Sequence, residues 1–148
     1  MTSRFASLSR FRDVGVLILR LAFGFQLVKV SYLNALFPAE NLPQFVAYLT
    51  ALGFPFPTIG VYLAAYTEFL GGILLLAGLW TRWAAIFLII NFGVAVGMGH
   101  LAVNDDYQNT FPAVNLLAVN IFLLLNGPGR FSIDQKLTKP SGESLISP

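Results

Sequence analysis

Four long apolar stretches separated by short polar segments dominate the sequence. They cover Val14–Phe37, Thr58–Leu79, Trp83–Val103 and Phe111–Leu125, and the fourth is also compatible with a start near Gln108. Each is close to the roughly 20 residues that a helix needs to cross about 30 Å of hydrocarbon. None shows the polar–apolar alternation of a barrel strand, and in lipid each backbone amide needs a partner within its own segment. The pattern therefore predicts an all-α integral membrane protein, a four-helix transmembrane bundle.

The segment between the first two stretches is periodic as well. In "NLPQFVAYLTALGFPFP" the apolar side chains recur at helical spacing, at positions Leu42, Phe45, Tyr48, Leu49 and Leu52. We therefore expect a short interfacial helix in this outer loop, ended by the prolines that follow it. Its simpler role is a lid over the bundle. The alternative is a lateral gate for a lipid-like ligand.

The end of the chain carries its own stop signals. Gly127-Pro128-Gly129 cannot continue a helix, and Ser132 with Gln135 has the spacing of a capping box, which predicts a second short interfacial helix. We divide the chain into an N-terminal segment (1–13), one four-span membrane domain (14–137) and a disordered tail (138–148). Small residues within the spans predict close helix contacts, at Gly71, Gly72 and Gly78 in the second and at Gly93 and Gly97 in the third.

Composition agrees with a membrane location. The chain of 148 residues is 56% hydrophobic and 11% charged, with a mean hydropathy of +0.71, against about 45–50% and about 25% in soluble domains. It has no cysteine, which excludes disulfides, thiolate metal sites and cysteine-bound iron–sulfur clusters. Its single histidine excludes a haem held by two histidines of one chain. The net charge of +2 is small, and no basic patch indicates nucleic-acid binding.

Basic residues predict the orientation. Of the nine Lys and Arg residues, Arg20 and Lys29 lie within the first span, and the other seven all fall on one side of a four-span chain. The opposite loops hold Glu40, Asp105 and Asp106 and no basic residue. The positive-inside rule then places both termini in the cytoplasm, in a bacterial-type inner membrane. Because Arg20 interrupts the first apolar run, we interpret that run as an uncleaved span rather than a signal peptide.

Three charged residues lie at membrane depth, where burial costs at least about 2.5–3.5 kcal/mol per charge. Glu68 is near the middle of the second span, and the depth of Arg20 in the first span makes an ion pair between them feasible. Nine residues at about 100° each place Lys29 on the opposite side of that helix, so we predict that Arg20 pairs with Glu68. The pair would either hold the helices in register or form part of a ligand site.

Uncharged polar residues extend this predicted polar cluster. Its amide members are Gln26, Asn91 and Asn115, and Asn120 is a further amide at membrane depth. These side chains would either bind a ligand or form hydrogen bonds between helices. The helical period places His100 nearly opposite Asn91 and close to the outer surface, where it would bond Asp105 or Asp106. One histidine with scattered acids lacks the spacing of a metal site, so no metal is predicted.

With these residues in view, the chain resembles the DoxX family of small four-helix membrane proteins. The resemblance covers about residues 15–137 and is carried by "LRLAFG", "YTEFLGGILLLAGLWTR", "NFGVAVGMGHL" and "GPGRFSID". The family often has a His-Gly pair and then a Lys late in the first helix. Here Val30, Ser31 and Asn34 stand at those positions, and Lys29 is out of register with that lysine.

The family takes its name from a small subunit of a thiosulfate:quinone oxidoreductase, so the resemblance implies a quinone or respiratory connection. We accordingly expect an accessory subunit of a quinone-linked or respiratory oxidoreductase, which binds a non-covalent quinone or a lipid near Arg20 and Glu68. The alternatives are a small-molecule or lipid transporter and a purely structural or assembly protein. The sequence has no hydrolytic or phosphate-binding motif, so an independent enzyme is not expected. Membrane lipid, a membrane redox complex or a second copy of the chain are the expected partners.

Overall fold

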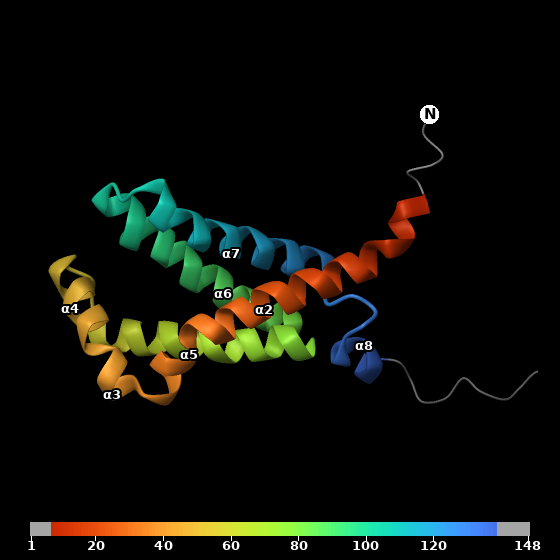
Figure 1. Ribbon diagram of the computed structural model, residues 1–148, viewed down its shortest axis with the longest axis horizontal. Helices are drawn as coiled ribbons and strands as arrows, with labels where there is room; N and C mark the ends of the chain where they lie inside the picture. Colours follow the sequence, from red (N-terminus) through yellow and green to blue (C-terminus); the bar gives the residue numbers. More distant parts are fainter. Residues whose placement is uncertain (1–6, 139–148) are drawn as a thin grey trace, which may run out of the picture.

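The computed structural model describes residues 7–138, and these residues form helices of very different lengths (Figure 1). In chain order they are η1 (Ser7–Phe11), α2 (Arg12–Leu36), α3 (Pro38–Asn41), α4 (Pro43–Ala51), α5 (Pro57–Ala77), α6 (Thr81–Val94), η2 (Ala95–His100), η3 (Leu101–Val103), α7 (Tyr107–Asn126) and α8 (Ile133–Thr138).

Four continuous helical segments are long and apolar enough to cross a membrane: residues 8–36, 57–77, 81–103 and 107–126. The predicted four-helix membrane bundle is therefore confirmed. The fourth span begins at Tyr107, close to the alternative start near Gln108, and it accommodates Pro112 in its second turn. The predicted disordered tail lies outside the described residues, apart from Thr138.

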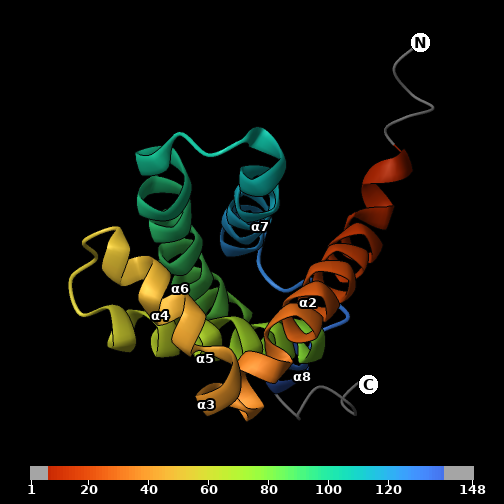
Figure 2. The same ribbon diagram turned by 60° about the vertical axis from the view of Figure 1, so that its left-hand side comes forward.

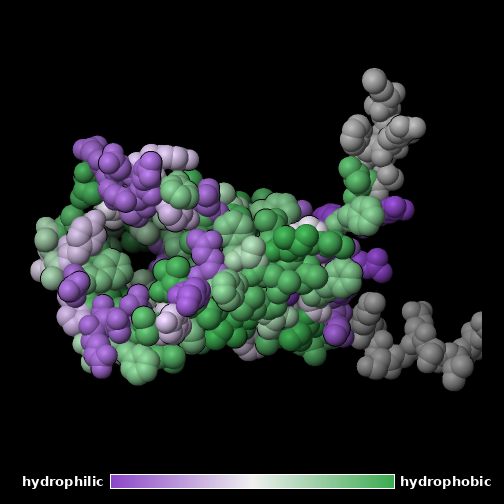
Figure 3. Space-filling model, viewed as in Figure 1, coloured by the Kyte–Doolittle hydropathy of each residue, from purple (hydrophilic) through white to green (hydrophobic). Residues whose placement is uncertain are grey.

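The surface of the bundle is apolar where a soluble protein would be polar. Phe25 is 63% exposed and Phe87 is 58% exposed, because the medium around them is lipid and not water. Figure 3 shows this apolar band in the middle of the molecule, with polar residues gathered toward its two ends. One end carries α3, α4 and the link between α6 and α7, whereas the other carries the start of α2, the α5–α6 turn and α8 (Figures 1 and 2).

Glycines allow α2 and α5 to pack closely. A Cβ atom added at Gly24 would lie 3.0 Å from the carbonyl oxygen of Gly72, and one added at Gly72 would lie 3.0 Å from that of Gly24. A Cβ atom added at Gly71 would likewise lie 2.9 Å from the Leu88 side chain of α6. The predicted contact role is wrong for Gly93 and Gly97, because a Cβ at either would meet no described atom within 4 Å.

Arg20 does not pair with Glu68, and the predicted ion pair is wrong. Its side chain is 1% exposed, and Nε donates to the carbonyl oxygen of Leu75 at 2.9 Å, while Nη2 donates to that of Leu76 at 3.3 Å. Nη1 donates to the carbonyl oxygens of Pro128 at 2.8 Å and Phe131 at 3.1 Å. The long side chain thus extends toward the α8 end and joins the last turn of α5 to the segment after α7.

The α5–α6 turn fits around this guanidinium group. Gly78 has a left-handed backbone (φ +66°) and lies directly against the guanidinium. Trp80, also left-handed (φ +48°), donates its backbone N–H to Asp134 Oδ1 at 2.7 Å, and the N–H of Thr81 donates to Oδ2 at 2.9 Å. The Asp134 carboxylate therefore caps α6 from α8. The predicted capping by Ser132 is confirmed, since its Oγ accepts the N–H of Gln135 at 3.1 Å.

The outer-loop helix forms as predicted, as α4 preceded by the single turn of α3. The buried Leu42, with Val46 and Leu49, packs on Val61 and Ala65 of α5. At the edge of α4 the Tyr48 hydroxyl donates to the carbonyl oxygen of Gly99 in η2 at 2.9 Å. The helix thus connects the second span to the third, and its role as a lid or as a lateral gate stays a prediction.

The link between α6 and α7 is held by hydrogen bonds to one carboxylate. Asp105 Oδ1 accepts from the Asn109 side chain at 2.8 Å, and Oδ2 lies 2.8 Å from His100 Nδ1. The predicted bond between His100 and an outer-loop acid is therefore confirmed. These partners hold the pKa of Asp105 below its ordinary value, the Asn109 amide most and His100 next.

We predict that Gly78→Ala destabilises the bundle by about 1–3 kcal/mol. Alanine is strained at positive φ, and its methyl group would displace the Arg20 guanidinium from its carbonyl acceptors. Thermal unfolding in detergent micelles measures the change. Gly93→Ala is the matched control, because its methyl group enters open space inside a helix and should leave stability unchanged or raise it by up to about 1 kcal/mol. Equal unfolding temperatures for the two variants would contradict this packing.

A carboxyl group whose pKa is lower in the folded than in the unfolded chain stabilises the fold at pH values above its unfolded pKa, near 3.9. This contribution is lost as the pH falls through the folded pKa. We therefore predict that the hydrogen bonds of Asp105 persist at neutral pH and are lost in strong acid. Asn109→Ala should raise the pKa of Asp105 toward its ordinary value, which a carbon-13 NMR titration of the carboxyl carbon measures. Gln108→Ala is the control, since Gln108 makes no described bond to Asp105, and an equal rise there would refute the assignment.

Candidate functional site

Glu68 projects from the middle of α5, eleven residues after its first residue and so about 16 Å along the helix. Its partner is an amide and not a cation: Asn91 Nδ2 of α6 donates to Glu68 Oε1 at 2.9 Å. The second oxygen, Oε2, has no hydrogen bond within residues 7–138. The site therefore presents a carboxyl oxygen free to bind a ligand at membrane depth.

Two cavities border the Glu68 side chain. The first, of about 180 Å³, lies beneath α4 and is lined mostly by apolar side chains, with Tyr48 and Phe54 on the α4 side and Met98 on the α6 side. The second, of about 250 Å³, lies between α2 and α7 and is lined by Gln26, Leu27 and residues of α7. Figure 3 shows the surface hollowed at this end of the molecule. An apolar cavity with a few converging polar groups is the usual form of a small-molecule site.

His100 borders both cavities as well. The prediction that it lies nearly opposite Asn91 is wrong, because both side chains line the cavity beneath α4. The cause is η2, a π-helical turn at Ala95–His100 whose wider spacing shifts every later residue around the helix axis. Since Nδ1 faces the Asp105 carboxylate, Nε2 is the nitrogen left for a ligand.

The other predicted site residues divide between this site and the rest of the molecule. Gln26 is half-buried and lines the second cavity. Lys29 is exposed, with its ammonium 5.4 Å from the centre of the Tyr32 ring, which fits its predicted place opposite Arg20. Arg20 lies outside both cavities, and Asn115 is exposed on α7. Asn120, predicted to bond between helices, donates instead to Leu116 of its own helix at 2.8 Å.

Sequence reasoning missed two contributors to this site. Tyr48 was recognised as an apolar position of the lid, and its hydroxyl bond to Gly99 was not expected. The π-helical turn was missed too, although the three glycines at 93, 97 and 99 are a signal of a weakened α-helix.

Packed residues separate the site from the α8 end. Between Glu68 and the Arg20 guanidinium the interior is filled by the buried residues Gly71, Gly72, Leu75 and Leu88. Both cavities therefore lie toward the end that carries α4.

Comparison with known proteins places the chain in a family. The DoxX family matches residues 15–101. The inner membrane protein YphA of Escherichia coli is 30% identical over 99 residues, which cover 62% of this chain and 70% of YphA. The uncharacterized membrane protein Rv3486 of Mycobacterium tuberculosis is 29% identical over 136 residues, or 84% of this chain and 82% of that protein. No solved structure matches.

The match spans the first three membrane helices, including Arg20, Glu68, Asn91 and His100. The fold, the four apolar spans and the similarity to two membrane proteins are therefore consistent with each other, and the chain belongs to the DoxX family of membrane proteins.

Proposed function

We propose that the chain binds the ring of a membrane quinone beside Glu68 and serves as an accessory subunit of a quinone-linked oxidoreductase system. The observation that carries this proposal is the position of the Glu68 carboxyl group, which borders two apolar cavities at membrane depth and keeps one oxygen unbonded among the described residues. Arg20, expected beside the ligand, has no part in it.

The polar groups of the site favour the reduced form of such a ligand. Glu68 Oε2 is an acceptor when ionised, and His100 Nε2 is an acceptor when Nδ1 donates to Asp105. A quinol has two hydroxyl donors, whereas a quinone has only carbonyl acceptors. Asn91 offers its second N–H to a carbonyl. With two acceptors and one donor, the site matches a quinol better than a quinone.

The size of the cavities fits a headgroup and not a whole molecule. Volumes of about 180 and 250 Å³ lie below the usual range for complete drug-sized ligands. A ring bound at Glu68 would therefore leave its isoprenoid tail in the lipid. The cavity between α2 and α7 provides this exit, since those two helices contact each other little.

Equilibrium dialysis of the purified chain in detergent, with a short-tailed ubiquinol and its oxidised form, tests the proposal. We expect the quinol to bind more tightly than the quinone. Glu68→Gln replaces the open oxygen with a donor, so it should weaken quinol binding by about tenfold or more and leave quinone binding unchanged or improved. Asn115→Leu, which removes an exposed amide from α7, is the control and should change neither.

Failure of the wild-type chain to bind either form, or equal effects of the two substitutions, would refute quinone binding. The transport alternative gains support from the cavities on two sides of Glu68. Uptake into proteoliposomes that is lost in Glu68→Gln, without quinol binding, would establish that alternative in its place. Cross-linking in native membranes to a redox enzyme tests the accessory role separately.

A further inference from the structure

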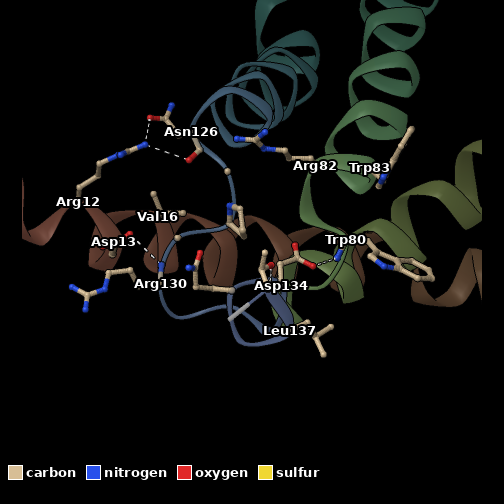
Figure 4. A pocket seen from close by; sticks show the side chains of 15 residues that line it. Arg12, Asp13, Val16, Trp80, Arg82, Trp83, Asn126, Arg130, Asp134 and Leu137 are labelled. Carbon is tan, nitrogen blue, oxygen red and sulfur yellow. Dashed lines mark hydrogen bonds between the residues drawn. The ribbon is translucent and has the colours of Figure 1, made fainter. Parts of the chain in front are cut away.

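A third cavity lies at the opposite end of the molecule from Glu68. It measures about 800 Å³ and is open, and its lining comes from the start of α2, the α5–α6 turn, the end of α7 and α8 (Figure 4). Three arginines border it, Arg12, Arg82 and Arg130. Two of them belong to motifs that the quinone site does not use, the Thr81-Arg82 pair and the Gly-Pro-Gly-Arg run.

Two of these arginines approach the end of α7 from different helices. Arg12 Nη2 donates to the side-chain oxygen of Asn126 at 3.0 Å and to its carbonyl oxygen at 3.3 Å. The guanidinium of Arg82 lies beside Gly127, where Nη2 would be 3.3 Å from an added Cβ. Figure 4 shows the Arg82 side chain extending from α6 toward α7, whereas Arg130 points away from the other two.

Both guanidinium groups retain unused donors. Arg82 makes no hydrogen bond or ion pair with any residue from 7 to 138, and the bonds of Arg12 in this part of the chain use Nη2 alone. A guanidinium carries five N–H donors. Arg12 and Arg82 interact favourably with the carboxyl end of α7, which explains their position. This interaction leaves their remaining N–H donors without acceptors among residues 7–138.

The carboxylates of the cavity are already engaged. Asp134 accepts the backbone N–H groups of Trp80 and Thr81, and Asp13 accepts the backbone N–H of Arg130 at 3.1 Å. Neither makes an ion pair with Arg12 or Arg82 within the described residues. The cavity is lined by three arginines and two aspartates, so its lining keeps a net positive charge and is complementary to an anion.

Two tryptophans place the cavity at the depth of lipid headgroups. Trp80 and Trp83 both line it, and each is 65% exposed. Exposed tryptophans gather at the boundary between lipid and water. Among the described residues, this end also carries Arg10, Arg12, Arg82, Arg130 and Lys136. The positive-inside rule then favours the cytoplasmic side for it, where anionic lipids attract basic groups.

We propose that Arg12 and Arg82 bind the phosphate of an anionic phospholipid in the cavity between the start of α2, the start of α6 and the end of α7. Guanidinium groups bind phosphate oxygens through paired, charge-assisted hydrogen bonds. A volume of about 800 Å³ lies within the range of sites that hold whole small molecules, so it accommodates a headgroup with its glycerol. The acyl chains extend along the exposed face of α6 beside Trp83.

Native mass spectrometry of the full chain in a neutral detergent, titrated with phosphatidylglycerol, phosphatidylcholine or inorganic phosphate, tests this site. We expect phosphatidylglycerol to bind at least about tenfold more tightly than phosphatidylcholine, because both carry a phosphate but the quaternary ammonium of choline cancels its charge and is repelled by the arginines. Arg82→Gln should weaken phosphatidylglycerol binding by about tenfold or more. Arg82→Lys, which keeps the charge without the paired geometry, should fall between that variant and the wild type.

Arg10→Gln is the matched control. It removes the same charge from the same end of the molecule, but Arg10 does not line the cavity, so it should weaken binding by less than about twofold. Equal losses in Arg10→Gln and Arg82→Gln would overturn the proposal, as would the absence of a preference for phosphatidylglycerol. Inorganic phosphate that binds as tightly as the lipid would assign the cavity to a soluble phosphate instead.

If Arg82→Gln fails to fold, as judged by circular dichroism and size exclusion, Arg12→Gln takes its place. Arg12 is exposed and its described bonds reach Asn126 alone. A loss of phosphatidylglycerol binding of about tenfold in this variant supports the site, and unchanged binding overturns it.

Discussion

The fold depends on how one buried guanidinium group finds acceptors in an apolar interior. Arg20 is 1% exposed, and burying such a charge without partners is far more costly than any single contact can offset. Its partners are carbonyl oxygens from the last turn of α5 and from the segment after α7. The last turn of a helix has carbonyls without intrahelical partners, so the arginine and α5 satisfy each other. Segments far apart in the sequence are joined in this way.

With Arg20 used in this way, Glu68 has no cationic partner among residues 7–138. Its neighbour is the neutral Asn91 amide, and the space around it is open to two cavities. An ion pair between Arg20 and Glu68 would have left neither charge available for other partners. In this chain the two charges are separated. Arg20 joins α5 to the segment after α7 at the α8 end, and Glu68 lies at the other end of the closely packed interior. The Arg20 side chain therefore fills the interior between α2, α5 and the segment after α7, whereas the Glu68 side chain borders cavities.

Hydrophobic patterning predicted the spans, the outer-loop helix and the capping of α8, because these depend on local spacing. It failed where a long side chain could reach more than one partner. Helical depth made an Arg20–Glu68 pair feasible. The actual acceptors include the carbonyls of Pro128 and Phe131, which are 108 and 111 residues away in sequence, and no sequence pattern predicts contacts at such a separation. His100 was misplaced because an ideal helical period was applied across a π-helical turn. Local signals thus predicted the elements, whereas the site depended on long-range contacts and a helix irregularity.

The pairing of the helices has a mechanical consequence. α2 packs chiefly on α5 and α6 packs chiefly on α7, while α2 and α7 contact each other little. The two pairs meet where α5 packs on α6, with Gly71 against Leu88 and Asn91 bonded to Glu68. Arg20 at the α8 end and the Tyr48–Gly99 bond beneath α4 join them further. Any displacement of one pair against the other therefore acts on the Asn91–Glu68 hydrogen bond, because that bond lies at the seam between the pairs and borders the cavity beneath α4.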